Sequence, residues 1–264
     1  MPELQIRGAR IHYEDSGTGT EAIVFAHGLL FSSRIFDEQI RALRDRYRCV
    51  AFDFRGQGQS EITRSGYDID SLAEDAAAVI EALGAAPCHF VGLSMGGFVG
   101  LRLAIRRPGL LRSLVLLDSS ADAEGLRDRL RYSALIVIAR WFGLRPVIGR
   151  VLPVMFGRRL LRNRELRTFW RDRILANDRV GAIRAVEGVL SRAGVYDDLG
   201  KITTPTLIVV GEEDRATPPV HSRRMHDVIS GSRLLVLPET GHMASIEAPE
   251  AVTDAIREFV RALS

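Results

Sequence analysis

Short apolar runs that alternate with helix-like segments are the feature of this sequence that most restricts its fold. Each run holds only three to five residues, as is typical of strands that are buried on both faces of a sheet. Strands that alternate with helices in this way predict a mostly parallel sheet with helices on both faces. The expected strands cover residues 23–26, 49–52, 89–91, 114–117, 206–210 and 234–237, and the expected helices cover 69–83, 94–107, 219–229 and 249–263.

The chain has 264 residues, enough to bury a sizeable apolar core. Residues 1–17 alternate polar and apolar side chains, which predicts a hairpin and lacks the apolar core of a signal peptide. The apolar run at 134–139 is far shorter than the roughly 20 residues that span a bilayer. We therefore expect a cytoplasmic protein with no membrane partner. Cys49 and Cys88 lie in strand-like runs and are expected to be buried, reduced thiols.

Residues 121–200 interrupt this alternation. They contain no convincing strand, and their 16 Arg against 9 Asp and Glu give a local charge of +7. An insertion of this kind usually lies over the carboxyl edge of an α/β sheet, where ligands bind. We therefore predict a helical cap at 121–200 on a core formed by 1–120 and 201–264. The arginine excess is explained most simply by helix faces that are exposed to solvent. The sequence contains no array of aromatic and basic residues, so we expect no nucleic-acid partner.

A lone serine stands among glycines where the run at 89–91 breaks. If a strand ends there and a helix begins at Met95, Ser94 occupies a tight, strained turn that projects its hydroxyl above the sheet edge. Only small neighbours two residues away on either side avoid a collision, which explains Gly92 and Gly96. A strand-helix turn without catalytic function also fits the glycines alone, but the flanking strand and helix favour a nucleophile.

A serine nucleophile needs a base and a group that orients the base. Among six histidines, His242 alone follows the last expected strand in a glycine-containing loop at the edge where Ser94 lies. Asp214 follows the penultimate strand and is the preferred carboxylate. Asp118, which follows the strand at 114–117, is its rival. The remaining histidines are interpreted as structural or surface residues: His12, His27, His89, His221 and His226.

Acyl transfer also needs two hydrogen-bond donors for the oxyanion that develops on the attacked carbonyl. The Met95 amide at the helix start is one candidate. The Leu29 amide is the other, because His27 and Gly28 allow a sharp turn after the run at 23–26. We interpret His27 as a residue that fixes this loop through hydrogen bonds.

At this point the chain resembles the α/β-hydrolase family over nearly its full length. The resemblance implies an eight-stranded, mostly parallel sheet with a cap after strand six, and a Ser-Asp-His order that Ser94, Asp214 and His242 follow. The residues that carry it are HG at 27–28, DFRGQGQS at 53–60, GLSMGG at 92–97, GEEDRATPP at 211–219 and GHMASIEAPE at 241–250.

Within the family the chain looks most like small bacterial 3-oxoadipate enol-lactonases, esterases and cofactor-free haloperoxidases. The resemblance implies hydrolysis of a small ester or lactone through an acyl-enzyme, with no metal or organic cofactor. A serine at position 94 argues against dehalogenases and epoxide hydrolases, which carry aspartate there. A carbon–carbon bond hydrolase, a perhydrolase-type haloperoxidase and a slow-turnover ligand receptor remain as alternatives. Both a monomer and a homodimer remain open. The expected substrate pocket comprises Leu30, Trp141, Phe142 and Met243.

Overall fold

The computed structural model describes residues 2–263. In this range the strands are β1 (Glu3–Ile6), β2 (Ala9–Ser16), β3 (Ala22–Ala26), β4 (Arg48–Phe52), β5 (Cys88–Leu93), β6 (Leu111–Leu117), β7 (Thr206–Gly211) and β8 (Arg233–Leu237). They form one sheet in the order β1-β2-β4-β3-β5-β6-β7-β8. β1 and β2 make the expected hairpin, β2 is antiparallel to β4, and all other neighbours are parallel. The predicted fold class is confirmed.

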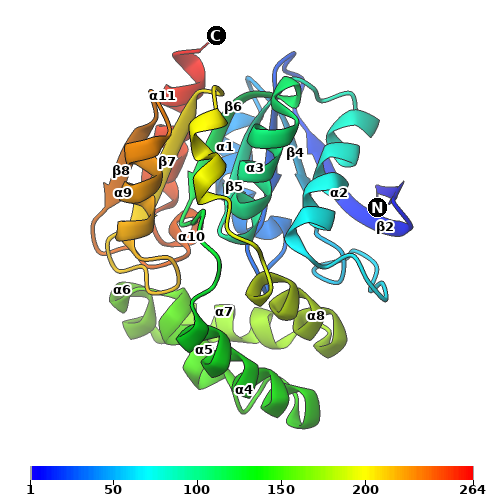
Figure 1. Cartoon of the computed structure of the whole chain (residues 1–264), viewed down its shortest axis with the longest axis vertical. Coiled ribbons are helices and arrows are strands. Elements are labelled where there is room, and N and C mark those ends of the chain that lie inside the picture. The colour runs from blue at the N-terminus through cyan, green and yellow to red at the C-terminus, as the bar shows by residue number, and fades with distance from the viewer. Residues whose placement is uncertain (1, 264) are drawn as a thin grey trace.

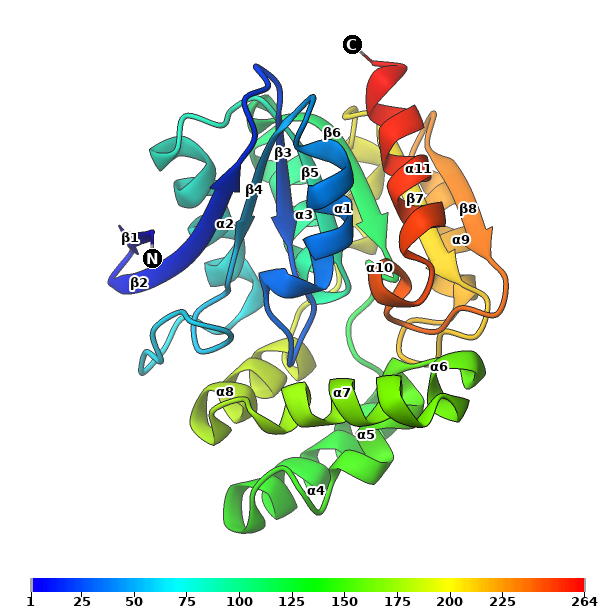
Figure 2. The same ribbon diagram turned by 180° about the vertical axis from the view of Figure 1, so that it is seen from behind.

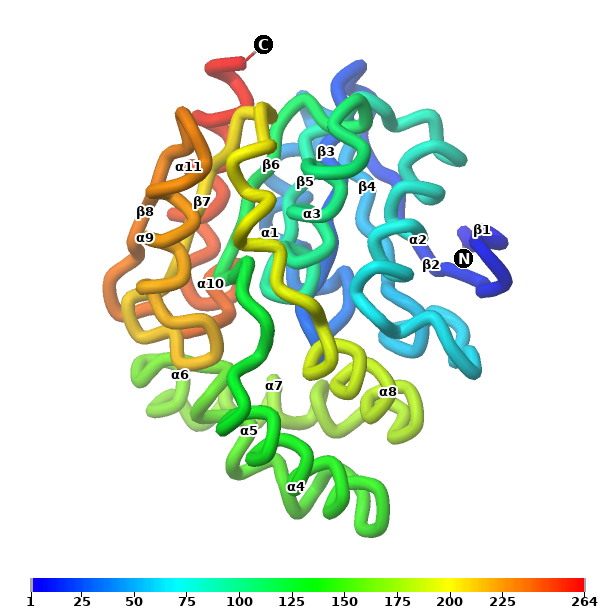
Figure 3. The backbone as a smooth tube through the Cα atoms, in the orientation of Figure 1, coloured from blue at the N-terminus to red at the C-terminus, as the bar shows by residue number. Residues whose placement is uncertain are grey.

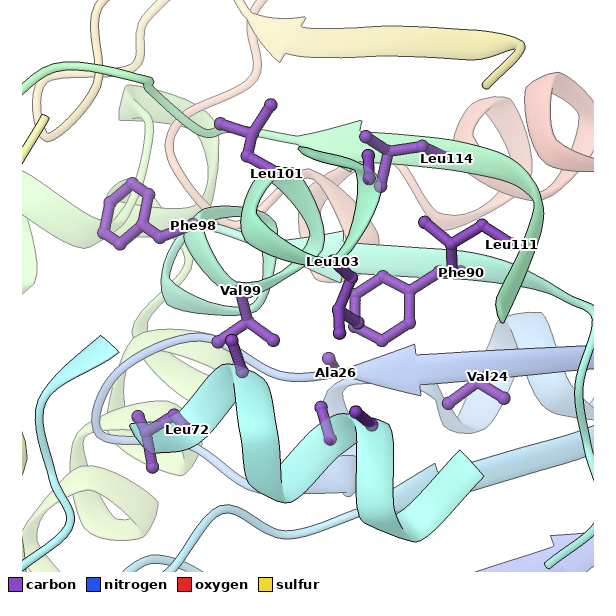
Figure 4. Close-up of a cluster of buried hydrophobic side chains, with 14 of the residues drawn as sticks. Val24, Ala26, Leu72, Phe90, Phe98, Val99, Leu101, Leu103, Leu111 and Leu114 are labelled. Carbon is purple, nitrogen blue, oxygen red and sulfur yellow. The ribbon is translucent and has the colours of Figure 1, made fainter. Parts of the chain in front are cut away.

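The apolar runs become central strands because both of their faces are covered. Along β3, Val24 and Ala26 pack into one apolar cluster, whereas Ile23 and Phe25 pack into another on the opposite face. This alternation follows the two-residue period of a strand. Figure 4 shows the first cluster, in which side chains from the sheet meet those of the helices packed against it.

Helices cover both faces of the sheet. α2, α3 and α9 lie on the face turned to the viewer in Figure 1, whereas α1 and α11 lie on the face seen in Figure 2. The Asp68 side chain accepts a hydrogen bond from the Ser71 amide and thereby caps the start of the second helix. These helices are α1 (Asp37–Leu43), α2 (Ile69–Ala82), α3 (Met95–Arg106), α9 (Pro219–Val228), the short α10 (Ala244–Glu247) and α11 (Pro249–Arg261).

The chain between β6 and β7 forms helices and, within the described residues, no strand. Figures 1 and 3 show these helices gathered beyond one edge of the sheet. We call them the cap helices; the exact domain limits of 121 and 200 stay a prediction. None of the helices in the described range is long and apolar enough to cross a membrane. The cap helices are α4 (Leu126–Phe142), α5 (Ile148–Met155), α6 (Arg158–Arg162), α7 (Arg164–Leu175) and α8 (Arg179–Leu190).

Cys49 and Cys88 are free and buried, as the sequence predicts. Burial raises the pKa of each thiol to about 12. The reactive thiolate is therefore suppressed at neutral pH.

Candidate active site

The sheet topology brings the predicted site residues to one edge. β3 pairs with both β4 and β5, so the connections reverse direction at β3 and leave a crevice at the carboxyl ends of the strands. The loop after β3 therefore lies beside the turn after β5 that carries Ser94. The loops after β7 and β8, which carry Asp214 and His242, open at the same edge.

Ser94 lies in the tight turn that the sequence predicts between β5 and α3. Its φ of 51° and ψ of −109° are strained values for a residue with a side chain. A Cβ at Gly92 would come within 2.3 Å of the Gly96 carbonyl oxygen, and one at Gly96 would come within 2.0 Å of the Ala26 carbonyl oxygen. The two glycines are therefore required by close backbone packing around the serine.

His242 connects Ser94 to Asp214 through hydrogen bonds. Its Nε2 lies 2.8 Å from Ser94 Oγ, and its Nδ1 lies 3.0 Å and 2.9 Å from the two Asp214 carboxylate oxygens. A carboxylate can only accept, so Nδ1 carries the proton and Nε2 accepts from the serine hydroxyl. The imidazole is 2% exposed and Ser94 is 7% exposed, which shields this chain of hydrogen bonds from solvent.

Asp214 is itself held in place by its own loop. Oδ1 accepts hydrogen bonds from the Ala216 and Thr217 amides, and Oδ2 accepts one from the Thr217 hydroxyl at 2.9 Å. These donors fix the carboxylate in the orientation that faces the imidazole. Thr217 was not among the sequence-predicted residues, although the motif at 211–219 contains it.

Asp118, the rival carboxylate, accepts hydrogen bonds from backbone amides and not from the imidazole of His242. It is fully buried, and its two oxygens accept hydrogen bonds from the Gly211 and Ala244 amides. It therefore ties the end of β7 to the start of α10. Burial, and then the nearby charge of Asp214, raise the pKa of Asp118 well above its usual range. No hydrogen bond joins it to His242 within the described residues.

Two backbone amides near Ser94 are available to an oxyanion. Within residues 2–263, neither the Leu29 nor the Met95 amide has a hydrogen-bond acceptor. Met95 begins α3, where free amides and the helix dipole favour negative charge. His27 stabilises the loop before Leu29 as expected: its Nδ1 donates to the Gly28 carbonyl and its Nε2 accepts from the Phe54 amide. Burial lowers the pKa of His27, which keeps the ring neutral.

The loop after Leu29 is anchored from two directions. Leu30 has a φ of 67°, an uncommon value for a side chain of this size. Its amide donates to Gln57 Oε1 at 2.7 Å, and its carbonyl accepts from Asn177 Nδ2 at 2.9 Å. Gln57 follows β4 and Asn177 follows α7, so the core holds the peptide group before Leu30 and the cap holds the one after it.

An apolar cavity of about 150 Å³ opens above Ser94 and His242. Its polar lining includes Arg192 and Glu124, which form an ion pair of 2.7 Å with each other. Among residues 2–263, no group of three or more His, Cys, Asp or Glu side chains could hold a metal ion. The cap contributes most of the cavity wall, including Tyr132, Leu135, Ile136 and Ala139 of α4 and Val186 and Leu190 of α8.

The expected substrate pocket needs correction. Leu30 lines the cavity, but Trp141, Phe142 and Met243 do not. Trp141 and Phe142 are each 76% exposed, because the face of α4 that carries Trp141 points away from the sheet and Phe142 ends the helix. Met243 directly follows His242 and is fully buried in the apolar cluster that also contains Phe25. The prediction for these three residues was wrong.

Sequence reasoning also missed Glu247, which stabilises the loop of His242. Its carboxylate accepts hydrogen bonds from the Gly157 amide at 2.8 Å and the Met243 amide at 3.3 Å. Burial raises the pKa of this carboxyl group. The same contacts link the segment before α6 to the core. Gln57 and Glu247 lie within motifs that the sequence already displays, whereas no local signal marks Asn177.

Comparison with known proteins agrees with this architecture. A family model described as alpha/beta hydrolase fold matches residues 21–249. An uncharacterized hydrolase of Bacillus subtilis is 30% identical, with 97% of this chain and 96% of the relative covered. A 3-oxoadipate enol-lactonase of Acinetobacter baylyi is 28% identical over 92% of this chain and 89% of its own. The structure of a thermophilic esterase from Thermogutta terrifontis is 28% identical with a TM-score of 0.92, covering 99% and 98% of the two chains. With its full sheet, its cap and these relatives, the chain belongs to the alpha/beta hydrolase family.

Proposed function

We propose that this hydrolase cleaves a small carboxylic ester or lactone through an acyl-enzyme formed on Ser94. The observation that carries the proposal is the continuous set of hydrogen bonds from Ser94 through His242 to Asp214 at the base of an apolar cavity. A serine hydroxyl is a poor nucleophile at neutral pH, and an adjacent imidazole is what activates it. The esterase and enol-lactonase relatives support the same reaction class.

In the first half of the reaction, Ser94 Oγ attacks the substrate carbonyl while His242 Nε2 takes the hydroxyl proton. Asp214 keeps the proton on Nδ1 and stabilises the imidazolium that forms. The Leu29 and Met95 amides donate to the oxyanion. His242 then gives its proton to the leaving alkoxide, the carbon–oxygen bond breaks, and the acyl group stays on Ser94.

In the second half, water takes the place of the alcohol. His242 removes a proton from the water as it attacks the acyl carbonyl, and the same two amides again bind the oxyanion. The proton then returns to Ser94 Oγ as the carboxylic acid leaves. No further group is needed to balance the reaction.

The cavity favours an uncharged, apolar acyl group. Arg192 is the arginine of its lining, and its charge is already paired with Glu124. The guanidinium also lies 4.3 Å over the Phe98 ring and donates to the Asp122 and Val189 carbonyls. A carboxylate on the substrate would have to displace these partners. An apolar cavity of this size can hold about six carbon atoms, since one of similar volume binds benzene.

Steady-state turnover tests the proposed reaction against the receptor alternative. We expect sustained multiple turnover of p-nitrophenyl butyrate and hexanoate, with a lower kcat/KM for the dodecanoate ester. A single slow acylation without further release of p-nitrophenol would contradict the proposal and favour a receptor.

Substitutions at Val186 should shift the preferred chain length in opposite directions. Val186 lines the cavity from α8, so Val186→Phe shortens it and Val186→Ala lengthens it. Each buried methylene is worth about 0.8 kcal/mol, or about fourfold in kcat/KM. We expect Val186→Phe to favour acetate over hexanoate by at least tenfold relative to the wild type, and Val186→Ala to favour longer chains. Val220→Phe, on exposed α9, is the matched control. Equal chain-length profiles in all three variants would show that the cavity does not hold the acyl group.

We call the loop after β3 that carries Leu29 and Leu30 the oxyanion loop. Asn177 and Gln57 are predicted to act as positioning residues for this loop. Asn177→Ala and Gln57→Leu each remove one hydrogen bond to Leu30, next to the proposed Leu29 donor. Complete loss of an oxyanion donor costs about 10²–10³ in rate, so we expect a partial loss of about tenfold. The loss should appear in kcat with little change in KM, because the donor acts mainly in the transition state. A change confined to KM would assign both residues to substrate binding instead.

A further inference from the structure

The outer face of α4 carries an apolar stripe that no other part of the described chain covers. Leu126, Leu130, Val137 and Trp141 are 73%, 65%, 57% and 76% exposed. An α-helix turns by about 100° per residue, which places all four within roughly 60° of its circumference. Figures 1 and 2 both show α4 as the outermost element of the cap, on the side away from the sheet.

Arginines flank this stripe on both sides. The same helical geometry puts Arg127 and Arg131 along one border and Arg129 and Arg140 along the other. All four are exposed, and Asp128 is the one acidic residue of the helix. Arg140 pairs with Glu187 of α8. The other three have no ion pair with a described residue, so α4 presents a net positive surface around an apolar centre.

The apolar side chains of the stripe are not needed to pack the cap. The opposite face of α4 already supplies the packed residues, among them Ile136 and Ala139, which line the cavity. On the outer face, Ala134 and the exposed Ser133 lie between Leu130 and Val137, so Ser133 is the polar residue within the stripe. Exposed apolar side chains that gather on one face, in contrast to single scattered ones, mark a site of interaction. Leucine and tryptophan on one face with arginine at its borders is the composition of helices that lie in a membrane interface.

We propose that the outer face of α4 docks on an anionic lipid membrane, with the stripe in the headgroup boundary and the arginines on lipid phosphates. Charge complementarity favours this occupant over a second copy of the chain. A symmetric dimer across the stripe would place the arginines of one copy against those of the other, which is unfavourable. The expectation of no membrane partner rested on the lack of a spanning segment, which an interfacial helix does not require.

Docking through α4 has a consequence for the proposed function. One face of α4 lines the acyl cavity, and the opposite face carries the stripe. Only the thickness of this helix therefore separates the cavity from the docked membrane. The cavity would therefore lie next to the phase in which apolar esters concentrate. The docking proposal itself does not depend on catalysis and is tested without it.

Vesicle binding by the full-length Ser94→Ala protein provides the test, because this variant cannot hydrolyse lipid by the proposed mechanism. We compare sedimentation with vesicles of pure phosphatidylcholine and with an equimolar mixture of phosphatidylcholine and phosphatidylglycerol. We expect at least tenfold tighter binding to the mixture, because each arginine near an anionic surface contributes about fivefold. The preference should shrink in high salt, which screens these charges. The proposal would be overturned if, at low salt, the protein bound the mixed vesicles no more tightly than pure phosphatidylcholine, or did not bind them at all.

Tryptophan emission locates the docked face. The chain has two tryptophans, and Trp170 is buried while Trp141 lies in the stripe. In a Trp170→Phe background, emission from Trp141 should shift to shorter wavelength when mixed vesicles are added. Binding with unchanged Trp141 emission would place the contact elsewhere and contradict the proposal. A dimer in sedimentation equilibrium that shields Trp141 without lipid would also contradict it.

Surface variants separate the two contributions. Leu130→Ser combined with Trp141→Ser should weaken binding to mixed vesicles by at least tenfold. Arg127→Gln combined with Arg131→Gln should remove most of the preference for the anionic lipid. Ile62→Ser combined with Val220→Ser, at exposed apolar positions outside the cap, should leave binding unchanged. Circular dichroism checks that each variant is folded. Similar losses in the control and in the stripe variants would refute the assignment.

Discussion

Ser94→Ala is expected to lower kcat for p-nitrophenyl butyrate by about 10⁶-fold, with the protein still folded. The hydroxyl is the atom that attacks the carbonyl, and without it neither His242 nor Asp214 has a nucleophile to activate. Members of such a hydrogen-bonded set act as a unit, so the residual rate would reflect the oxyanion donors and substrate binding alone. This residual activity should be about 10³–10⁴ above water.

Ser120→Ala is the matched control for this prediction. Ser120 is also a buried serine near the same sheet edge, but its hydroxyl accepts a hydrogen bond from the Asp122 amide and contacts neither His242 nor Asp214. Its activity should remain near that of the wild type. A fluorophosphonate probe should add its mass to the peptide that contains Ser94 and to no other. Near wild-type turnover by Ser94→Ala, or labelling elsewhere, would refute the proposed nucleophile.

The strands and the sharp turn at Ser94 were predictable because their causes are local. A strand that is covered on both faces needs apolar side chains at every position, so it appears in the sequence as an unbroken apolar run such as 23–26. The same is true of Gly92, whose absent side chain makes room for the backbone of Gly96 and Gly97, four and five residues further along. Gly96 makes room for Ala26 on the adjacent strand, but its place two residues after Ser94 still marks the turn. Local steric needs of this kind leave a visible pattern in the sequence.

The anchoring of the oxyanion loop could not be predicted because its causes are distant in the sequence. His27 and Gly28 suggested where the chain turns, yet the left-handed backbone falls at Leu30. That conformation is compensated by hydrogen bonds from Gln57 and Asn177, which lie 27 and 147 residues further along the chain. Strain of this kind is tolerated only when tertiary contacts compensate for it.

The orientation of α4 shows a second limit. Periodicity identifies which residues share a helix face, but it does not say which face meets the core when both are apolar. In α4 the face with Leu135 and Ile136 turns to the cavity, whereas the face with Val137 and Trp141 turns to solvent. The aromatic residues therefore looked like pocket residues in the sequence. Packing of α4 against α8 decides the orientation, and a single helix does not encode that packing.

Asp214→Asn is expected to lower kcat by about 10⁴-fold, and Asp118→Asn by much less. The side-chain amide that replaces the Asp214 carboxylate would donate toward His242 Nδ1. It would thereby favour the tautomer that carries its proton on Nε2, which cannot accept from Ser94. In Asp118→Asn the change falls on the Gly211 and Ala244 amides instead. One of these buried amides would lose its acceptor, which costs about 1–3 kcal/mol of stability. The two variants should therefore differ in kind: one loses turnover and the other loses thermal stability.

Measuring kcat and Tm for both variants separates the catalytic carboxylate from the structural one. Asp118 joins the end of β7, just before the loop of Asp214, to the start of α10, just after His242. Its loss should therefore loosen the spacing of Asp214 and His242 without removing the charge beside the imidazole. Its raised pKa points the same way, because a carboxyl group that resists ionisation is poorly suited to stabilise an imidazolium. If Asp118→Asn lost more turnover than Asp214→Asn while keeping its Tm, Asp118 would be the catalytic carboxylate and Asp214 the structural one.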